Sequence, residues 1–113
     1  MERYNPVKQA ASEPETRIAM DLVETYEPAR IISIHTPLEV VNYDGPARAL
    51  AERMARHNGY PVRGDIGYPT PGSFGNFAGV EKQIPTITLE LPPGPFAPVW
   101  EDNLAALMAA LSF

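Results

Sequence analysis

The chain has 113 residues, which suits a single domain with a modest hydrophobic core. It has no cysteine, and this excludes disulfide bonds, thiolate zinc sites and a cysteine nucleophile. A net charge of -5 argues against binding to duplex nucleic acid, and no apolar run approaches the roughly 18 residues of a membrane span.

The first predicted element is a helix over about residues 13–26. Ser12 and Glu15 form a capping box at its start. Large apolar residues then recur every four positions and form one stripe, namely Ile18, Leu22 and Tyr26. Residues 1–11 have no such periodicity, so we expect a leader or loop there. They show no secretory signal, and with the lack of cysteine this favours a cytoplasmic protein.

Three isoleucines in residues 30–35 predict a buried strand that ends at His35. We expect residues 36–44 to be a loop. Asp44 is then a candidate cap for a second helix, and Asn58–Gly59 suits the left-handed end of that helix.

The second half of the chain also contains predicted strands and helices in alternation. A short strand is predicted near 61–64, an irregular loop at 67–76 and a short helix at 77–83. Residues 85–91 give a strong strand signal, because β-branched residues follow a proline. A last helix over about 99–112 carries one apolar face, formed by Leu104, Leu107, Met108 and Leu111.

Helices that alternate with apolar strands predict a single domain over 1–113 with an α/β fold. Its sheet should be small, mostly parallel and flanked by helices. Parallel strands are usually buried on both faces, and this chain supplies few neighbours for them. The shortage suggests that part of the domain is missing.

Two polar residues stand at the carboxyl ends of the predicted strands, where open parallel sheets place their sites. They are His35 and Glu90, a pair that suits a metal ligand and a general base. A lone histidine at a strand end more often has a structural role than a functional one. Burying a glutamate is costly, so a structural and a functional role are equally favoured for Glu90. His57, beside a helix end, favours a structural role.

The loop from Gly67 to Gly75 is rich in glycine and proline. Such a loop either lines a site or forms an ordinary surface turn. Within it, Tyr68 could donate a hydrogen bond or simply pack.

Four segments resemble the zinc carboxypeptidase family, in the manner of the bacterial murein tripeptide amidases. Residues 32–38 (ISIHTPL) resemble the strand that ends in a histidine ligand. Residues 68–75 (YPTPGSFG) and 86–92 (TITLELP) resemble later parts of the same family, and 11–17 resembles the helix before the histidine strand. The segments follow the family's order over about 10–93.

The resemblance implies a role for each matching residue. His35 would be the third zinc ligand, and Glu90 would activate water and shuttle its proton. Tyr68 would contact the substrate, while Gly72 and Ser73 would shape the specificity pocket. The implied substrate is a peptide, specifically a murein peptide cleaved at the amide next to diaminopimelate.

The sequence also departs from the family. It lacks the His-x-x-Glu motif that supplies the first two zinc ligands, and it lacks the Asn-Arg pair that grips the substrate. The resemblance therefore implies the C-terminal part of a catalytic domain. Because catalytic zinc normally takes three protein ligands, we expect this chain alone to hold zinc poorly and to be inactive.

Two other functions stay open on the sequence. One is a deacylase of N-acyl amino acids, related to the desuccinylases. The other is a non-catalytic module that binds a peptide or partner protein through a sheet edge. A sheet cut along one side also exposes an edge and apolar faces, so we expect self-association.

Overall fold

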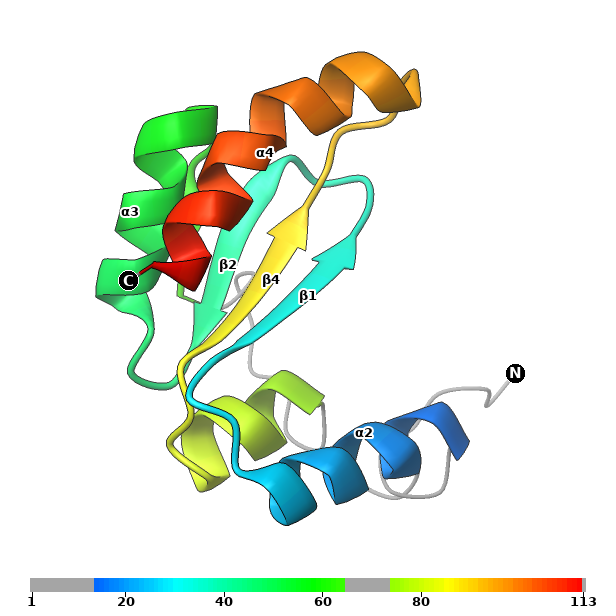
Figure 1. Cartoon of the computed structure of the whole chain (residues 1–113), viewed down its shortest axis with the longest axis vertical. Coiled ribbons are helices and arrows are strands. Elements are labelled where there is room, and N and C mark those ends of the chain that lie inside the picture. Colours follow the sequence, from blue (N-terminus) through cyan, green and yellow to red (C-terminus); the bar gives the residue numbers. More distant parts are fainter. Residues whose placement is uncertain (1–13, 65–73, 113) are drawn as a thin grey trace.

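The computed structural model describes residues 14–64 and 74–112 (Figure 1). Within them, four strands form one sheet in the order β1-β4-β2-β3. In chain order these strands are β1 (Ile31–His35), β2 (Val40–Asp44), β3 (Val62–Arg63) and β4 (Thr86–Glu90). The helices are α2 (Pro14–Tyr26), α3 (Arg48–Asn58), the π-helix η1 (Asn76–Glu81) and α4 (Phe96–Leu111).

The sheet is mixed, with β1 at one outer edge. β1 runs parallel to β4, and β2 runs parallel to β3. Only the pairing between β2 and β4 is antiparallel. The predicted α/β fold, with a small and mostly parallel sheet flanked by helices, is confirmed.

The main core lies on the face of the sheet that α3 and α4 cover (Figure 1). Ile87 and Leu89 from β4 are fully buried against Leu50 and Met54 from α3. The fully buried side chains that α4 contributes to this core are small, which lets the helix approach closely, and Leu107 packs partly against the same core. The small residues are Ala106 and Ala110.

A second, smaller cluster joins α2 to η1, near the end of the sheet where β1 and β4 begin (Figure 1). Val23 from α2 packs with Phe77 and Ala78 from η1. Ile31, the first residue of β1, packs partly against the same cluster. The two clusters therefore lie on different sides of the molecule.

The prediction of a loop over 36–44 was wrong, because residues 40–44 form β2 in the middle of the sheet. Val40 and Val41 are β-branched and suit a strand, but the run is too short to stand out between turn residues. Asp44 consequently ends a strand and does not cap α3, which begins at Arg48 after Ala47. Gly59 ends α3 with a left-handed φ of 73°, as predicted.

The apolar stripes of the first and last helices lie mostly outside the core, although Leu107 of α4 packs partly against it. On α2, Ile18, Leu22 and Tyr26 are exposed, and Val23 is the buried residue. On α4 the buried residues are smaller and lie on another face of the helix, whereas the large ones are mostly exposed. The exposed set includes Leu104, Met108 and Leu111. Across the two described ranges, no helix has the length and apolar character needed to cross a membrane.

Candidate active site

The two residues predicted to share a site are direct neighbours in the sheet. His35 ends β1 and Glu90 ends β4, and the parallel register pairs their Cα atoms. Parallel neighbours lie about 4.8 Å apart, and paired residues project to the same face of a sheet. The strand register therefore places His35 and Glu90 on the same face of the sheet, as expected.

Polar residues continue along this face toward the beginning of the strands. Ser33 pairs with Thr88, which in turn pairs with Asn42 of β2. With His35 and Glu90 they form a patch on the face opposite the α3–α4 core; we call these five residues the polar face. Sequence reasoning missed Asn42 because it lies in the segment expected to be a loop.

Two oxygens of the polar face are buried without a partner. Glu90 is 7% exposed and Asn42 is 5% exposed. Glu90 Oε1 and Asn42 Oδ1 accept no hydrogen bond from any residue of the described ranges. An unsatisfied buried polar atom costs about 1–3 kcal/mol. Such a cost is retained where a site needs a free acceptor, so these oxygens make the polar face the candidate site among the described residues.

His35 differs from Glu90 in being exposed, at the outer edge of the sheet. A neutral imidazole in that position can ligate a metal, and a carboxylate next to it can take a proton from water. The residues present do not complete a zinc site, because within 14–64 and 74–112 no three His, Cys, Asp or Glu side chains cluster.

The other predicted site residues divide into two kinds. Tyr68, Gly72 and Ser73 lie outside the described residues, so their predicted roles stay predictions. His57 lies exposed in the last turn of α3, where a basic residue suits the helix dipole. It belongs to α3, which covers the face of the sheet opposite the polar face, and its expected structural role stays a prediction.

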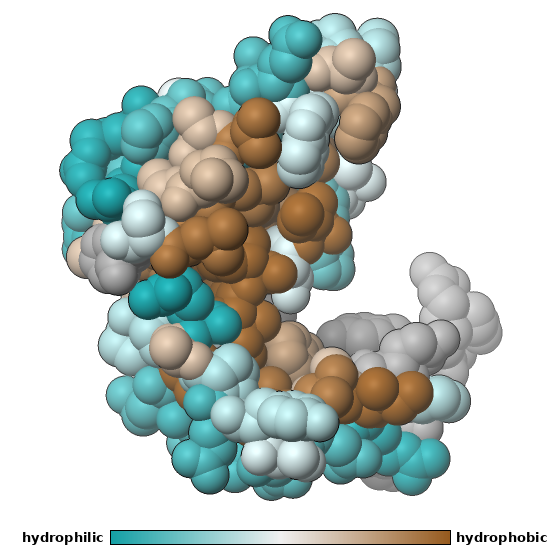
Figure 2. Space-filling model, viewed as in Figure 1, coloured by the Kyte–Doolittle hydropathy of each residue, from teal (hydrophilic) through white to brown (hydrophobic). Residues whose placement is uncertain are grey.

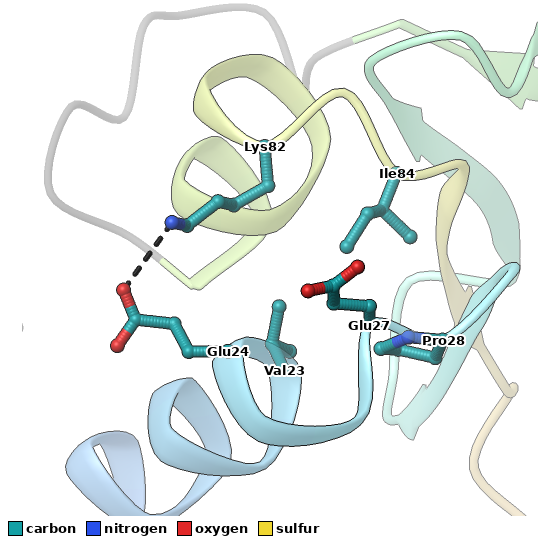
Figure 3. A pocket seen from close by; sticks show the side chains of 6 residues that line it. All are labelled: Val23, Glu24, Glu27, Pro28, Lys82 and Ile84. Carbon is teal, nitrogen blue, oxygen red and sulfur yellow. Dashed lines mark ion pairs between the residues drawn. The ribbon is translucent and has the colours of Figure 1, made fainter.

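A hollow of about 500 Å³ lies between α2 and η1 (Figure 3). Lys82 Nζ lies 3.2 Å from Glu24 Oε2 across it, and the same ammonium lies 5.5 Å from the centre of the Phe77 ring. Both partners of the ion pair are well exposed. The pair ties two helices together and presents no catalytic group to the polar face.

The chain is similar to curated murein peptide amidases. It is 39% identical to murein peptide amidase A of Vibrio campbellii over 100 residues, covering 88% of this chain and 39% of the relative. It is 37% identical to murein peptide amidase A of Escherichia coli K12 over 82 residues, covering 73% of this chain and 33% of the relative. No protein-family model matches the sequence.

A solved structure agrees with this similarity. The murein-tripeptide amidase MpaA of Escherichia coli O157 superposes with a TM-score of 0.74 at 33% identity, over 93% of this chain and 43% of that one. The chain thus spans about two-fifths of the length of the relatives that it matches. Sequence and fold together identify it as a homologue of part of the murein peptide amidases, with the carboxypeptidase-like fold that its strand motifs resemble.

Proposed function

We propose that this chain supplies His35 and Glu90 to a hydrolytic site that cleaves an amide bond in a murein peptide. The observation that carries the proposal is the pairing of His35 with Glu90 on one face, with a buried Glu90 oxygen that has no partner among the described residues. The names of the curated relatives support the substrate class.

In this proposal Glu90 acts as the general base and then as the general acid. Its carboxylate takes a proton from the attacking water while the water oxygen bonds to the scissile carbonyl carbon. It then gives that proton to the leaving nitrogen as the C–N bond breaks. Glu90 is buried on the polar face, and this restricts the carboxylate to few positions, which favours both transfers.

Zinc is part of the proposal, with His35 as one of its ligands. When bound, the ion would provide Lewis-acid catalysis. The described residues do not bring together the three ligands that such a site needs. The isolated chain is therefore expected to bind no stoichiometric zinc and to cleave no murein peptide, and stoichiometric zinc together with cleavage by the purified chain would contradict this.

Asn42 gives the polar face a second acceptor, two residue pairs deeper along the strands than the His35–Glu90 pair. Its free Oδ1 suits an N–H or ammonium group of the substrate. We assign it to substrate binding, since an amide side chain does not ionise near neutral pH and cannot act as a general acid or base.

The test is a chimera in which this chain replaces the matching portion of the Vibrio campbellii relative. The chimera should hydrolyse a murein tripeptide substrate. Glu90→Gln should lower kcat by at least about 1,000-fold while zinc stays bound. The matched control is Glu101→Gln, on an exposed position of α4, which should leave kcat unchanged. A chimera that folds and binds zinc but keeps its activity after Glu90→Gln would refute the proposal.

The same chimera separates the alternative functions. Faster hydrolysis of N-acyl amino acids than of murein peptides would favour the deacylase. Peptide binding without hydrolysis, at an affinity unchanged by Glu90→Gln, would favour a non-catalytic module.

A further inference from the structure

Asn58 is the last residue of α3, and Gly59 follows it in the left-handed conformation. It is the one asparagine in the sequence that a glycine follows. Asparagine converts to a carboxylate when the backbone nitrogen of the next residue attacks its side-chain carbonyl carbon, and glycine hinders this attack least because it has no Cβ. The space around Gly59 is open as well, since an added Cβ would meet no atom of the described residues within 4 Å, apart from its chain neighbours.

The conversion of Asn58 needs only water as a reactant. The Gly59 nitrogen gives its proton to solvent and bonds to Cγ of Asn58, while the bond from Cγ to Nδ2 breaks. The leaving nitrogen takes a proton and departs as ammonia, which leaves a cyclic imide. Water then opens the imide at either carbonyl carbon, so the product is aspartate or isoaspartate.

Both reacting groups are hydrogen-bonded in the folded chain. The Gly59 N–H donates to the Ala55 carbonyl at 2.7 Å. The Asn58 side chain donates through Nδ2 to Asn103 Oδ1 at 3.0 Å, and its Oδ1 accepts from the Tyr60 N–H at 3.0 Å. The attacking nitrogen thus keeps its proton and the amide is held at both ends, so the imide forms only after these bonds open.

The hydrogen bonds of Asn58 continue into α4. Asn103 is 1% exposed, and its Nδ2 donates to the Tyr60 hydroxyl and to the Val99 carbonyl, both at 2.9 Å. Both polar atoms of the Asn103 side chain therefore have partners, as buried polar atoms require. We call Asn58, Tyr60 and Asn103 the asparagine network.

This network is a specific contact between α3 and α4. The fully buried apolar side chains of α4 are small, and its larger ones are mostly exposed, where Figure 2 shows hydrophobic surface around this helix. Few large side chains therefore fix α4 in place, and the asparagine network does part of that work.

The product of the conversion does not fit the network. A carboxylate at position 58 cannot donate to Asn103 Oδ1, and it adds negative charge at the C-terminus of α3, where the helix dipole disfavours it. We propose that Asn58 is a site of spontaneous modification, whose amide converts to a carboxylate when the asparagine network opens and whose conversion loosens α4. This inference does not depend on the proposed hydrolysis.

The experiment is prolonged incubation of the full 113-residue chain, folded in buffer and unfolded in urea. Peptide mapping by mass spectrometry follows conversion at each asparagine. In urea, Asn58 should convert at least about tenfold faster than Asn42 or Asn103, which precede bulky residues. In buffer its rate should fall at least about tenfold. No conversion in urea, or equal rates in the two states, overturns the proposal.

Variants then show which opening controls the rate. Asn103→Ala and the milder Tyr60→Phe should each speed conversion of Asn58 in buffer at least about fivefold, because each removes a hydrogen bond of the network. The control is Leu89→Ala, which destabilises the sheet core and leaves the network intact. Circular dichroism checks that all three variants fold.

The fraction unfolded, measured for each variant by urea denaturation, distinguishes local from global opening. Conversion in Leu89→Ala should rise no more than its unfolded fraction accounts for, whereas in the two network variants it should rise more. Rates that follow the unfolded fraction alone in all three variants overturn control by the network.

The consequence of conversion is tested with Asn58→Asp. This variant should lower the midpoint of thermal unfolding by at least about 4 °C and speed hydrogen exchange of the α4 amides. Asn58→Ala loses the same hydrogen bonds without adding a charge, so it should lower the midpoint less. An unchanged midpoint with unchanged exchange in Asn58→Asp contradicts the loosening of α4.

Discussion

The two faces of the sheet are built differently. The face under α3 and α4 is closed and apolar, with Ile87 and Leu89 fully buried. The polar face holds two buried oxygens without partners in the described part of the chain. The same strands therefore provide stability on one side and chemical groups on the other. Alternation of side chains along a strand makes this division inevitable once one face is buried.

The comparison also explains why the buried polar residues lower the stability of the isolated chain. Buried polar atoms without hydrogen bonds destabilise the fold, and Glu90 carries one of them on β4, beside the edge strand β1. A closed core is needed to hold them in place. Substitutions on the closed face, at the end of the polar face, at its buried charge and at a contact remote from both faces test this difference in turn.

The largest effect is expected on the closed face. Leu89→Ala removes a fully buried side chain and leaves a cavity, so it should lower the free energy of unfolding by about 3 kcal/mol. The control is Ile34→Ala on the same face, which should cost less than about 1 kcal/mol because this residue is exposed. Urea denaturation measures both, and equal losses would show that the closed face is not a packed core.

A smaller loss of stability is expected at η1, where Gly79 lies against Asp44 at the end of β2. A Cβ added at Gly79 would lie 2.6 Å from the carbonyl carbon of Asp44 and 2.7 Å from its oxygen. Backbone atoms must then move, so Gly79→Ala should cost about 2 kcal/mol. Gly59→Ala meets no atom within 4 Å but has a positive φ, and should cost only about 1 kcal/mol. Thermal unfolding compares the two, and the reverse order would contradict this close approach.

The buried charge of the polar face should act in the opposite direction. Glu90→Gln keeps the shape of the side chain and removes its charge, so it should stabilise the isolated chain by about 1 kcal/mol at neutral pH. Glu101→Gln, on an exposed position, should change stability by less than about 0.5 kcal/mol. Loss of stability in the Glu90 variant would mean that its carboxylate serves the fold.

The smallest effect is expected in the hollow between α2 and η1. Glu24→Gln breaks an exposed ion pair with Lys82, which should cost less than about 0.5 kcal/mol. The effect should vanish at high salt, since exposed pairs are screened. A loss above about 1 kcal/mol in urea denaturation would show that this pair does more than tie two helices together.

Much of the fold follows from local sequence patterns. The isoleucine run of β1 and the β-branched run of β4 are strong signals, and both strands lie where they were predicted. β2 was missed because five residues between turns carry too little periodicity. Its place between β4 and β3 depends on pairing with distant segments, which no local pattern encodes.

The residues of the candidate site could also be predicted only in part from the sequence. His35 and Glu90 could be predicted because each follows a recognisable strand, and parallel pairing then brings the strand ends together. Asn42 could not, because the two β-branched valines before it form too short a run to indicate a strand. The stripes on α2 and α4 were correctly identified as apolar, but periodicity cannot tell whether such a face meets the core or another part of the domain.

The central claim is that His35 and Glu90 act as one unit. It is tested most directly by a double-mutant cycle in the chimeric amidase, with kcat/KM for a murein tripeptide as the readout. If the two side chains serve one site, His35→Ala and Glu90→Gln together should reduce kcat/KM no more than the more severe single variant. Losses that multiply, or a single variant that leaves kcat/KM intact, would contradict it.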